Sequence, residues 1–399
     1  MSRLTAGLFS GLIVLTAPSV AAAQAIEEGR VRVDVTGYAQ IQWNTTSVDE
    51  EDLDPNGVLD PSIAWSTFET RRIRPTVRVV IDDWIEGKIQ PDFALGEIQL
   101  ADAFIDFAIG EAFGIRFGQF KKPFSRIELT SSSRIIAIER GLRIRGLVDA
   151  FLFDLANEPD PPFVDIDGGL LLGDEYTLLD ALGYLGRDMG VAVHGGSGRL
   201  GYALGVFNGS GADRRDDSDG KSVAGRVEYS PRDDWPLVIA AAGSYRELLF
   251  DGELLGVGVR DEIDGFALEA DVEWGEFRRP GAHVLVEGVI GENFVAGLTP
   301  GPAPGPADAT LLGLQAVLAW FEPYPAAGGR IEGVEPLLRA SYGDPSLDRD
   351  GDGGWLLTPG ANLYFFGGNR VMLNWDVFLA GGEAVETEHA LRVQTQLSY

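Results

Sequence analysis

A dense group of basic residues occupies one stretch of the chain, from residue 116 to residue 147. The stretch holds eight arginines and lysines but only Glu128 and Glu139 as acids, which gives it a formal charge of +6. The planar guanidinium fork of arginine donates two hydrogen bonds to one phosphate or carboxylate group. Such side chains, gathered in a narrow cavity of low dielectric constant, concentrate anions. The stretch therefore predicts reversible binding of small oxyanions.

Two sets of basic residues are the candidates for this chemistry. The first is the candidate anion-binding set: Lys121, Lys122, Arg126, Arg134 and Arg140. The second set would form a basic track along a wall: Arg72, Arg74, Arg78 and Arg116. The alternative is purely structural, with the arginines paired to nearby acids that brace the protein: Asp102, Asp106 and Glu128.

The next stretch reverses this charge. Residues 148–180 carry nine acids and no base, and the whole chain has a formal net charge of −29. Farther on, Asp348, Asp350 and Asp352 begin a calcium-loop pattern, but Pro359 stands at its twelfth position, where a bidentate glutamate is needed. A solvated acidic loop is therefore favoured there over a weak calcium site.

The composition argues against other chemistry. The chain has three histidines and no cysteine, and no catalytic motif accompanies any of the histidines. A hydrolase and a transition-metal site are both disfavoured for that reason. No P-loop, dinucleotide fingerprint or nucleic-acid motif is present. We expect no enzymatic activity, no cofactor and no nucleic-acid partner.

The elements that must position the basic side chains are strands with one apolar and one polar face. The last nine residues alternate without interruption, because side chains of a strand point to opposite faces with a period of two. Residues 64–81, 268–274 and 370–377 follow the same rule. Strands of about ten residues with this pattern suit a barrel whose outside contacts lipid and whose inside contacts water. The sequence therefore predicts an all-β, transmembrane antiparallel β-barrel.

The ends and connections of the chain support this prediction. Residues 1–25 read as a secretory signal peptide, with cleavage after Ala23 or Ala25. Residues 26–399 would then form the barrel, with short turns at one rim and long polar loops at the other. Most of the eight tryptophans lie near predicted strand ends, where interfacial girdles belong. The length suggests about 16 strands.

Several motifs together resemble those of the phosphate-selective porin O and P family. The segment 116–124, Arg-Phe-Gly-Gln-Phe-Lys-Lys-Pro-Phe, is similar to the family's central strand pattern, and Glu128-Leu129-Thr130-Ser131-Ser132 and Glu139-Arg140 follow it. Further agreement comes from segments spread along the chain: 71–75, 102–106, 205–209 and 396–399. Ser125 departs from the family, which usually has glycine there, and Tyr399 replaces the more usual phenylalanine.

The resemblance implies a sixteen-stranded trimeric barrel in the outer membrane of Gram-negative bacteria, with a third loop that folds inward as a basic constriction. On this sequence the constriction loop spans about residues 121–147, and an acidic insertion follows at about 148–180. The residues and the resemblance together predict a passive channel for small hydrophilic solutes that prefers anions. Phosphate or a related oxyanion is the leading solute, and outer-membrane lipids and two further copies are the expected partners.

Other functions stay open at this point. The acidic insertion could plug the barrel, which would then act as a receptor or adhesin. The channel could also be non-selective or cation-selective, because the acidic loops oppose the basic stretch. A secreted soluble β-protein is the remaining alternative, since half-buried strands of a sandwich alternate in the same way.

Overall fold

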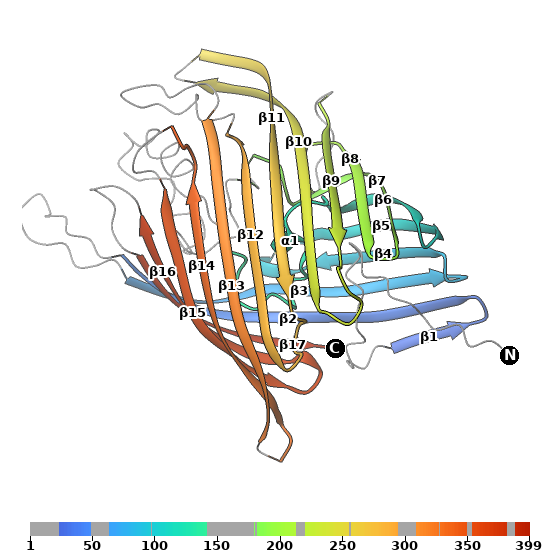
Figure 1. Cartoon of the computed structure of the whole chain (residues 1–399), viewed down its shortest axis with the longest axis vertical. Helices are drawn as coiled ribbons and strands as arrows, with labels where there is room; N and C mark the ends of the chain where they lie inside the picture. Colours follow the sequence, from blue (N-terminus) through green and yellow to red (C-terminus); the bar gives the residue numbers. More distant parts are fainter. Residues whose placement is uncertain are drawn as a thin grey trace, which may run out of the picture.

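The computed structural model describes residues 24–48, 64–96, 98–141, 179, 182–212, 220–254, 257–293, 309–326, 328–348, 353–380 and 388–399. Within these ranges, sixteen antiparallel strands form one closed barrel, which confirms the predicted fold class (Figure 1). The strands are β2 (Val31–Val48), β3 (Ala64–Ile81), β4 (Ile85–Asp92), β5 (Gln99–Gly110), β6 (Phe113–Lys121), β7 (Arg187–Ser197), β8 (Leu200–Phe207), β9 (Ser222–Tyr229), β10 (Leu237–Leu254), β11 (Val257–Trp274), β12 (Gly281–Asn293), β13 (Ala309–Ala326), β14 (Ile331–Asp344), β15 (Gly354–Phe365), β16 (Arg370–Ala380) and β17 (Glu388–Ser398). The other described elements are β1 (Gln24–Glu28), α1 (Arg126–Leu129) and the short 3-10 helices η1 (Ala94–Gly96) and η3 (Phe366–Gly368).

The barrel closes where the last strand meets β2. Pairing between β17 and β2 runs to Ser398 opposite Tyr38, and Tyr399 and Gly37 then exchange backbone hydrogen bonds of 3.0 and 2.9 Å. A Cβ atom on Gly37 would lie 2.5 Å from the Tyr399 hydroxyl, so a larger residue there would displace the Tyr399 ring from its present position. Beyond that point β1 continues the pairing along β2. Both described ends of the chain therefore meet on one strand.

The two faces of the wall are as the alternation predicts. On β17, Leu397 is 60% exposed while Gln396 is 5% exposed. The same division separates Leu268 from Glu269 on β11 and Leu373 from Asn374 on β16. Apolar side chains thus cover the outside and polar ones fill the inside, as a barrel in lipid requires.

The connections divide between the two rims. Consecutive strands are joined by short turns at one rim, here called the turn rim, including residues 82–84, 111–112 and 198–199. The opposite rim, here called the loop rim, carries the longer connections, including 49–63, 122–186 and 294–308. Trp235 and Trp274 pack at the turn rim with ring centroids 5.9 Å apart, both facing outward. This position matches an interfacial aromatic girdle.

Some predicted features lie outside the described residues. They are residues 1–23 of the signal peptide, nearly all of the acidic insertion at 148–180, and the calcium-loop residues Asp350 and Asp352. In the described ranges no helix has the length and apolar character needed to cross a membrane.

Candidate functional site

Residues 122–141, here called the inner segment, lie inside the barrel. Its backbone is bound by inward-facing side chains of strands far apart around the wall. Gln40 of β2 donates to the Ser132 carbonyl at 2.9 Å, and Asn362 of β15 donates to the Ile136 carbonyl at 2.9 Å. These side chains belong to the wall face opposite the exposed apolar residues. The inner segment therefore crosses the interior rather than covering the loop rim.

Glu139 is the strongest anchor of the inner segment. Its carboxylate accepts hydrogen bonds from Arg71 at 2.7 Å and from Arg72 at 2.9 Å, both on β3. Its carbonyl accepts from Arg339 of β14 at 2.7 Å. Glu139 is 3% exposed and has a φ of 61°, an uncommon conformation for a residue with a side chain. Contacts from two distant strands hold it there.

The start of the inner segment contains Ser125, where the sequence departs from the family that it resembles. Ser125 has a φ of 65°, which lies in the left-handed region that glycine adopts without strain. Its hydroxyl offers compensation, because it donates to Glu287 of β12 at 2.6 Å and accepts from the Glu128 amide at 3.3 Å. The second bond caps the single turn of α1.

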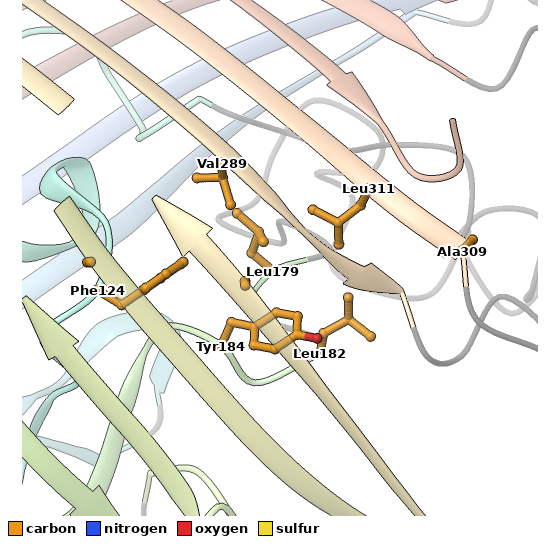
Figure 2. Close-up of a cluster of buried hydrophobic side chains, with 9 residues drawn as sticks. Phe124, Leu179, Leu182, Tyr184, Val289, Ala309 and Leu311 are labelled. Atoms are coloured by element: carbon orange, nitrogen blue, oxygen red, sulfur yellow. The ribbon is translucent and has the colours of Figure 1, made fainter. Parts of the chain in front are cut away.

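Apolar side chains also hold this region against the wall. Phe124 packs with Leu179, Leu182 and Tyr184 against the inward face of β12 and β13 (Figure 2). The Tyr184 hydroxyl donates to the Glu292 carbonyl at 2.7 Å. A second apolar group joins the inner segment to β12, β13 and β14: Ile127, Ile136, Ala137, Leu285, Val317, Ala319 and Leu337. One side of the barrel interior is therefore filled by packed side chains.

Four of the five candidate anion-binding residues have carboxylates as neighbours. Glu128 lies 3.2 Å from the Lys121 ammonium and 3.1 Å from the Arg140 guanidinium. Lys122 is 3.5 Å from Asp188 and donates to the Gly183 carbonyl at 2.7 Å. Each of these contacts ties the inner segment to itself or to the wall.

Arg126 contacts acids on two strands of the wall. Its guanidinium lies 2.8 Å from Glu273 of β11 and 3.2 Å from Glu228 of β9. Arg126, like Lys121, Lys122 and Arg140, therefore has its charge largely balanced by acids.

Arg134 differs from the other four. Among the described residues no carboxylate lies within ion-pair distance of its guanidinium, and burial alone lowers its pKa. The ordinary pKa of arginine lies so far above neutrality that the side chain stays charged. Arg134 lines a recess between the inner segment and the wall of β11 to β14, together with His283 and Arg339. Within the part of the chain that the structure describes, it is the member of the set whose charge no acid balances.

The four arginines of the predicted track all lie on the inward face, and each has an acid beside it. Arg72 pairs with Glu139 as described, and Arg74 contacts Asp92 at 2.6 Å. The other two pairs are Arg78 with Glu86 at 2.6 Å and Arg116 with Asp106 at 2.7 Å. Of the four, only Arg78 has a widely exposed side chain, at 38%.

Several buried charged residues were not among the sequence candidates. Arg226 of β9 is 2% exposed and contacts Glu269 at 2.8 Å and also Asp271. Arg339 and Arg392 both contact Asp376, at 3.0 and 2.9 Å. The alternation of polar and apolar residues predicts that most of these side chains lie on the polar face of their strands. It does not predict their contacts, because the partners are far apart in the sequence. In the described ranges no group of acids and histidines is arranged to hold a metal ion.

Comparisons with known proteins agree with this architecture. The profile of the family described as phosphate-selective porin O and P matches residues 70–261, which confirms the resemblance over that part of the chain. No curated protein matches the sequence.

Solved porin structures share the fold. The anion-selective porin from Comamonas acidovorans is 12% identical, covers 92% of this chain and all of its own, and gives a TM-score of 0.54. The outer membrane channel DcaP of Acinetobacter baumannii is 10% identical, covers 93% of this chain and 99% of its own, and gives a TM-score of 0.52. The trimer form of in-vitro folded OmpT of Vibrio cholerae is 12% identical, covers 92% of this chain and 100% of its own, and gives a TM-score of 0.52. At these identities the likeness shows the fold alone.

Proposed function

We propose that this protein is an outer-membrane porin that lets small hydrophilic solutes diffuse passively and prefers anions. The observation that carries the proposal is Arg134, a charged side chain without an acidic partner among the described residues, on a segment inside a porin-type barrel. A positive charge in a narrow lumen attracts anions and repels cations. Diffusion needs no cofactor or energy source, and export would use the signal peptide at residues 1–25.

The other basic residues have a different part in this proposal. Lys121, Lys122, Arg126 and Arg140 hold the inner segment in place as the constriction, because each already lies beside a carboxylate. Their paired charges add less to the field in the lumen than Arg134 does. Of the predicted track, Arg78 is the residue most able to meet a solute, since its side chain is 38% exposed.

Phosphate or a related oxyanion is the proposed solute class, supported by the family match over residues 70–261. The printed name of the Comamonas acidovorans relative, an anion-selective porin, agrees with an anion preference. A homotrimer in outer-membrane lipid is proposed by analogy with the trimer form of OmpT.

The test is the ion selectivity of two charge-reversal variants in planar bilayers. Arg134→Glu changes the charge by two units, and over roughly 8 Å of water this shifts the energy of a passing ion by about 1 kcal/mol, or about fivefold in the permeability of that ion. The control, Arg232→Glu, alters a turn-rim side chain that is 53% exposed and pairs with Asp234. We expect the anion-to-cation permeability ratio to fall only in Arg134→Glu.

Other results would redirect the proposal. Cation preference in the unmodified protein would mean that the acidic loops dominate the field, and the anion proposal would be wrong while the porin remained. Absence of any conductance would favour the plugged receptor or adhesin.

A further inference from the structure

Arg134 directly follows a backbone carbonyl that two wall residues hold in place. The Arg134 amide donates to the Ser131 carbonyl at 2.8 Å, which closes a tight turn of the inner segment. Just before it, the Ser133 carbonyl accepts from Gln396 of β17 at 3.1 Å and from Arg370 of β16 at 3.2 Å. The position of Arg134 in the lumen therefore depends on these two wall side chains.

Arg370 is bound by neutral groups, whereas the other buried arginines of the wall pair with carboxylates. Arg370 is 1% exposed, and it also donates to the Gln396 amide oxygen at 3.2 Å and to the Tyr364 hydroxyl at 3.4 Å. Among the described residues its link to an acid is indirect, because the Tyr364 hydroxyl donates in turn to Glu335 at 2.6 Å. Burying a charge without a direct counter-charge costs free energy. The geometry that Arg370 imposes, rather than stability that it adds, therefore distinguishes it.

The β11–β12 turn, residues 275–280, packs on Arg370 at the turn rim. Strands β13 and β14 separate β12 from β15 in the sheet, yet the Phe277 ring of this turn meets the Tyr364 ring of β15 edge to face, with centroids 5.9 Å apart. The guanidinium carbon of Arg370 lies 5.4 Å from the centre of the Phe277 ring, within the range of a cation–π contact. The turn therefore bends inward and packs on the residue that holds Ser133.

We propose that Arg370 is a positioning residue for the ion selectivity of the channel. It holds Arg134 in place through the Ser133 carbonyl, and the Phe277 ring packs over its guanidinium. The planar fork of arginine suits this part, because it donates to three fixed acceptors at once. Arg370 itself does not touch the solute, since it is 1% exposed. The inference rests on the proposed anion preference and adds to it a wall residue and a turn that lie outside the constriction.

Two substitutions separate position from charge. Arg370→Lys keeps the charge but offers one ammonium nitrogen, which cannot occupy the places of both terminal guanidinium nitrogens. Phe277→Leu changes no charge and removes only the ring. Moving Arg134 from about 8 to about 12 Å from a passing ion would lower the chloride-to-potassium permeability ratio about twofold. We expect a loss of this size for both variants in reversal potentials measured across a KCl gradient.

Amide exchange measured by mass spectrometry locates the change. Arg370→Lys should raise the exchange rate across residues 131–135, where the Arg134 amide closes the turn, by about tenfold, the effect of one lost hydrogen bond. The rate across residues 136–141 should stay as in the unmodified protein, because the Glu139 carboxylate remains bound to the wall.

Arg226→Lys is the matched control. Arg226 is also buried, at 2% exposure, and its guanidinium pairs with acids of the wall: Glu228, Glu269 and Asp271. Its replacement by lysine keeps the charge and leaves the Ser133 carbonyl with both of its donors. We expect the reversal potential and the exchange across residues 131–135 to match those of the unmodified protein.

The outcomes separate this inference from the proposed function. A reversal potential unchanged in both Arg370→Lys and Phe277→Leu would overturn the positioning role and leave the anion porin intact. An equal rise in exchange across residues 131–141 would also overturn it, because the segment would then undock as a whole. If Arg370→Lys failed to fold, Phe277→Leu would carry the same test. Faster exchange confined to residues 131–135, in a channel without anion preference, would support the positioning role and overturn the proposed function.

Discussion

Replacing Glu139 by glutamine should release the inner segment from the wall. The carboxylate is 3% exposed and Arg72, one of its partners, is 0% exposed. Removing one member of a buried ion pair costs about 3–5 kcal/mol, because the other charge stays buried. Glutamine keeps a hydrogen-bond acceptor, so we expect the docked inner segment to lose about 3 kcal/mol of stability, at the lower end of this range.

Hydrogen exchange measured by mass spectrometry would report the release directly. The Ile138 amide donates to Asn374 at 3.0 Å and is protected only while the segment stays docked. Every 1.4 kcal/mol changes an equilibrium constant about tenfold, so Glu139→Gln should raise the rate of amide exchange across residues 131–141 by about 100-fold. Single-channel conductance should become larger and noisier, because the loosened segment lies in the lumen.

Glu332→Gln is the matched control. Glu332 pairs with Arg278 at the turn rim, where the two side chains are 31% and 28% exposed. Such a pair contributes about 0–1 kcal/mol, so exchange in the inner segment should not change. If Glu139→Gln exchanged no faster than the control, the buried Glu139 contacts would not be what docks the segment.

Three further predictions follow from the same geometry. Ser125→Ala should lower the free energy of unfolding by about 1–3 kcal/mol, because buried Glu287 loses its 2.6 Å donor. Ser125→Gly should lower it less, because glycine tolerates the φ of 65°. Denaturant unfolding in detergent would measure both variants. Leu314 lies on the lipid-facing side of β13 and is 46% exposed, so Leu314→Arg should lower the free energy of unfolding by about 2–4 kcal/mol. Tyr324→Arg, near the turn rim, should lower it by only about 0–1 kcal/mol. Equal losses of stability in the two variants would contradict a lipid-facing belt. Anion preference should stay constant between about pH 6 and pH 8, since burial lowers the pKa of Arg134 from a value far above this range and the side chain stays charged; a loss of preference on raising the pH would assign the selectivity to another group.

The strands could be predicted closely because their signal is local. Residues 64–81 form one strand with the predicted bounds, and the faces of residues 391–399 are as the alternation indicated. A period of two depends only on neighbours in the chain, and lipid on one side with water on the other enforces it.

The charge balance of the site could not be predicted in the same way. The basic stretch has few acids nearby in sequence, which made an unbalanced cluster the natural expectation. Arg126 instead meets Glu273, 147 positions away, and Arg72 meets Glu139 through the inner segment. These partners are neighbours only once sixteen strands have closed, so no local pattern distinguishes Arg134 from Arg126 or Arg140.

The reversal potential of the unmodified protein in a KCl gradient across a planar bilayer tests the central claim most directly. We predict discrete conductance steps and a reversal potential whose sign shows chloride passing more readily than potassium. A reversal potential of the opposite sign would contradict the anion preference assigned to Arg134.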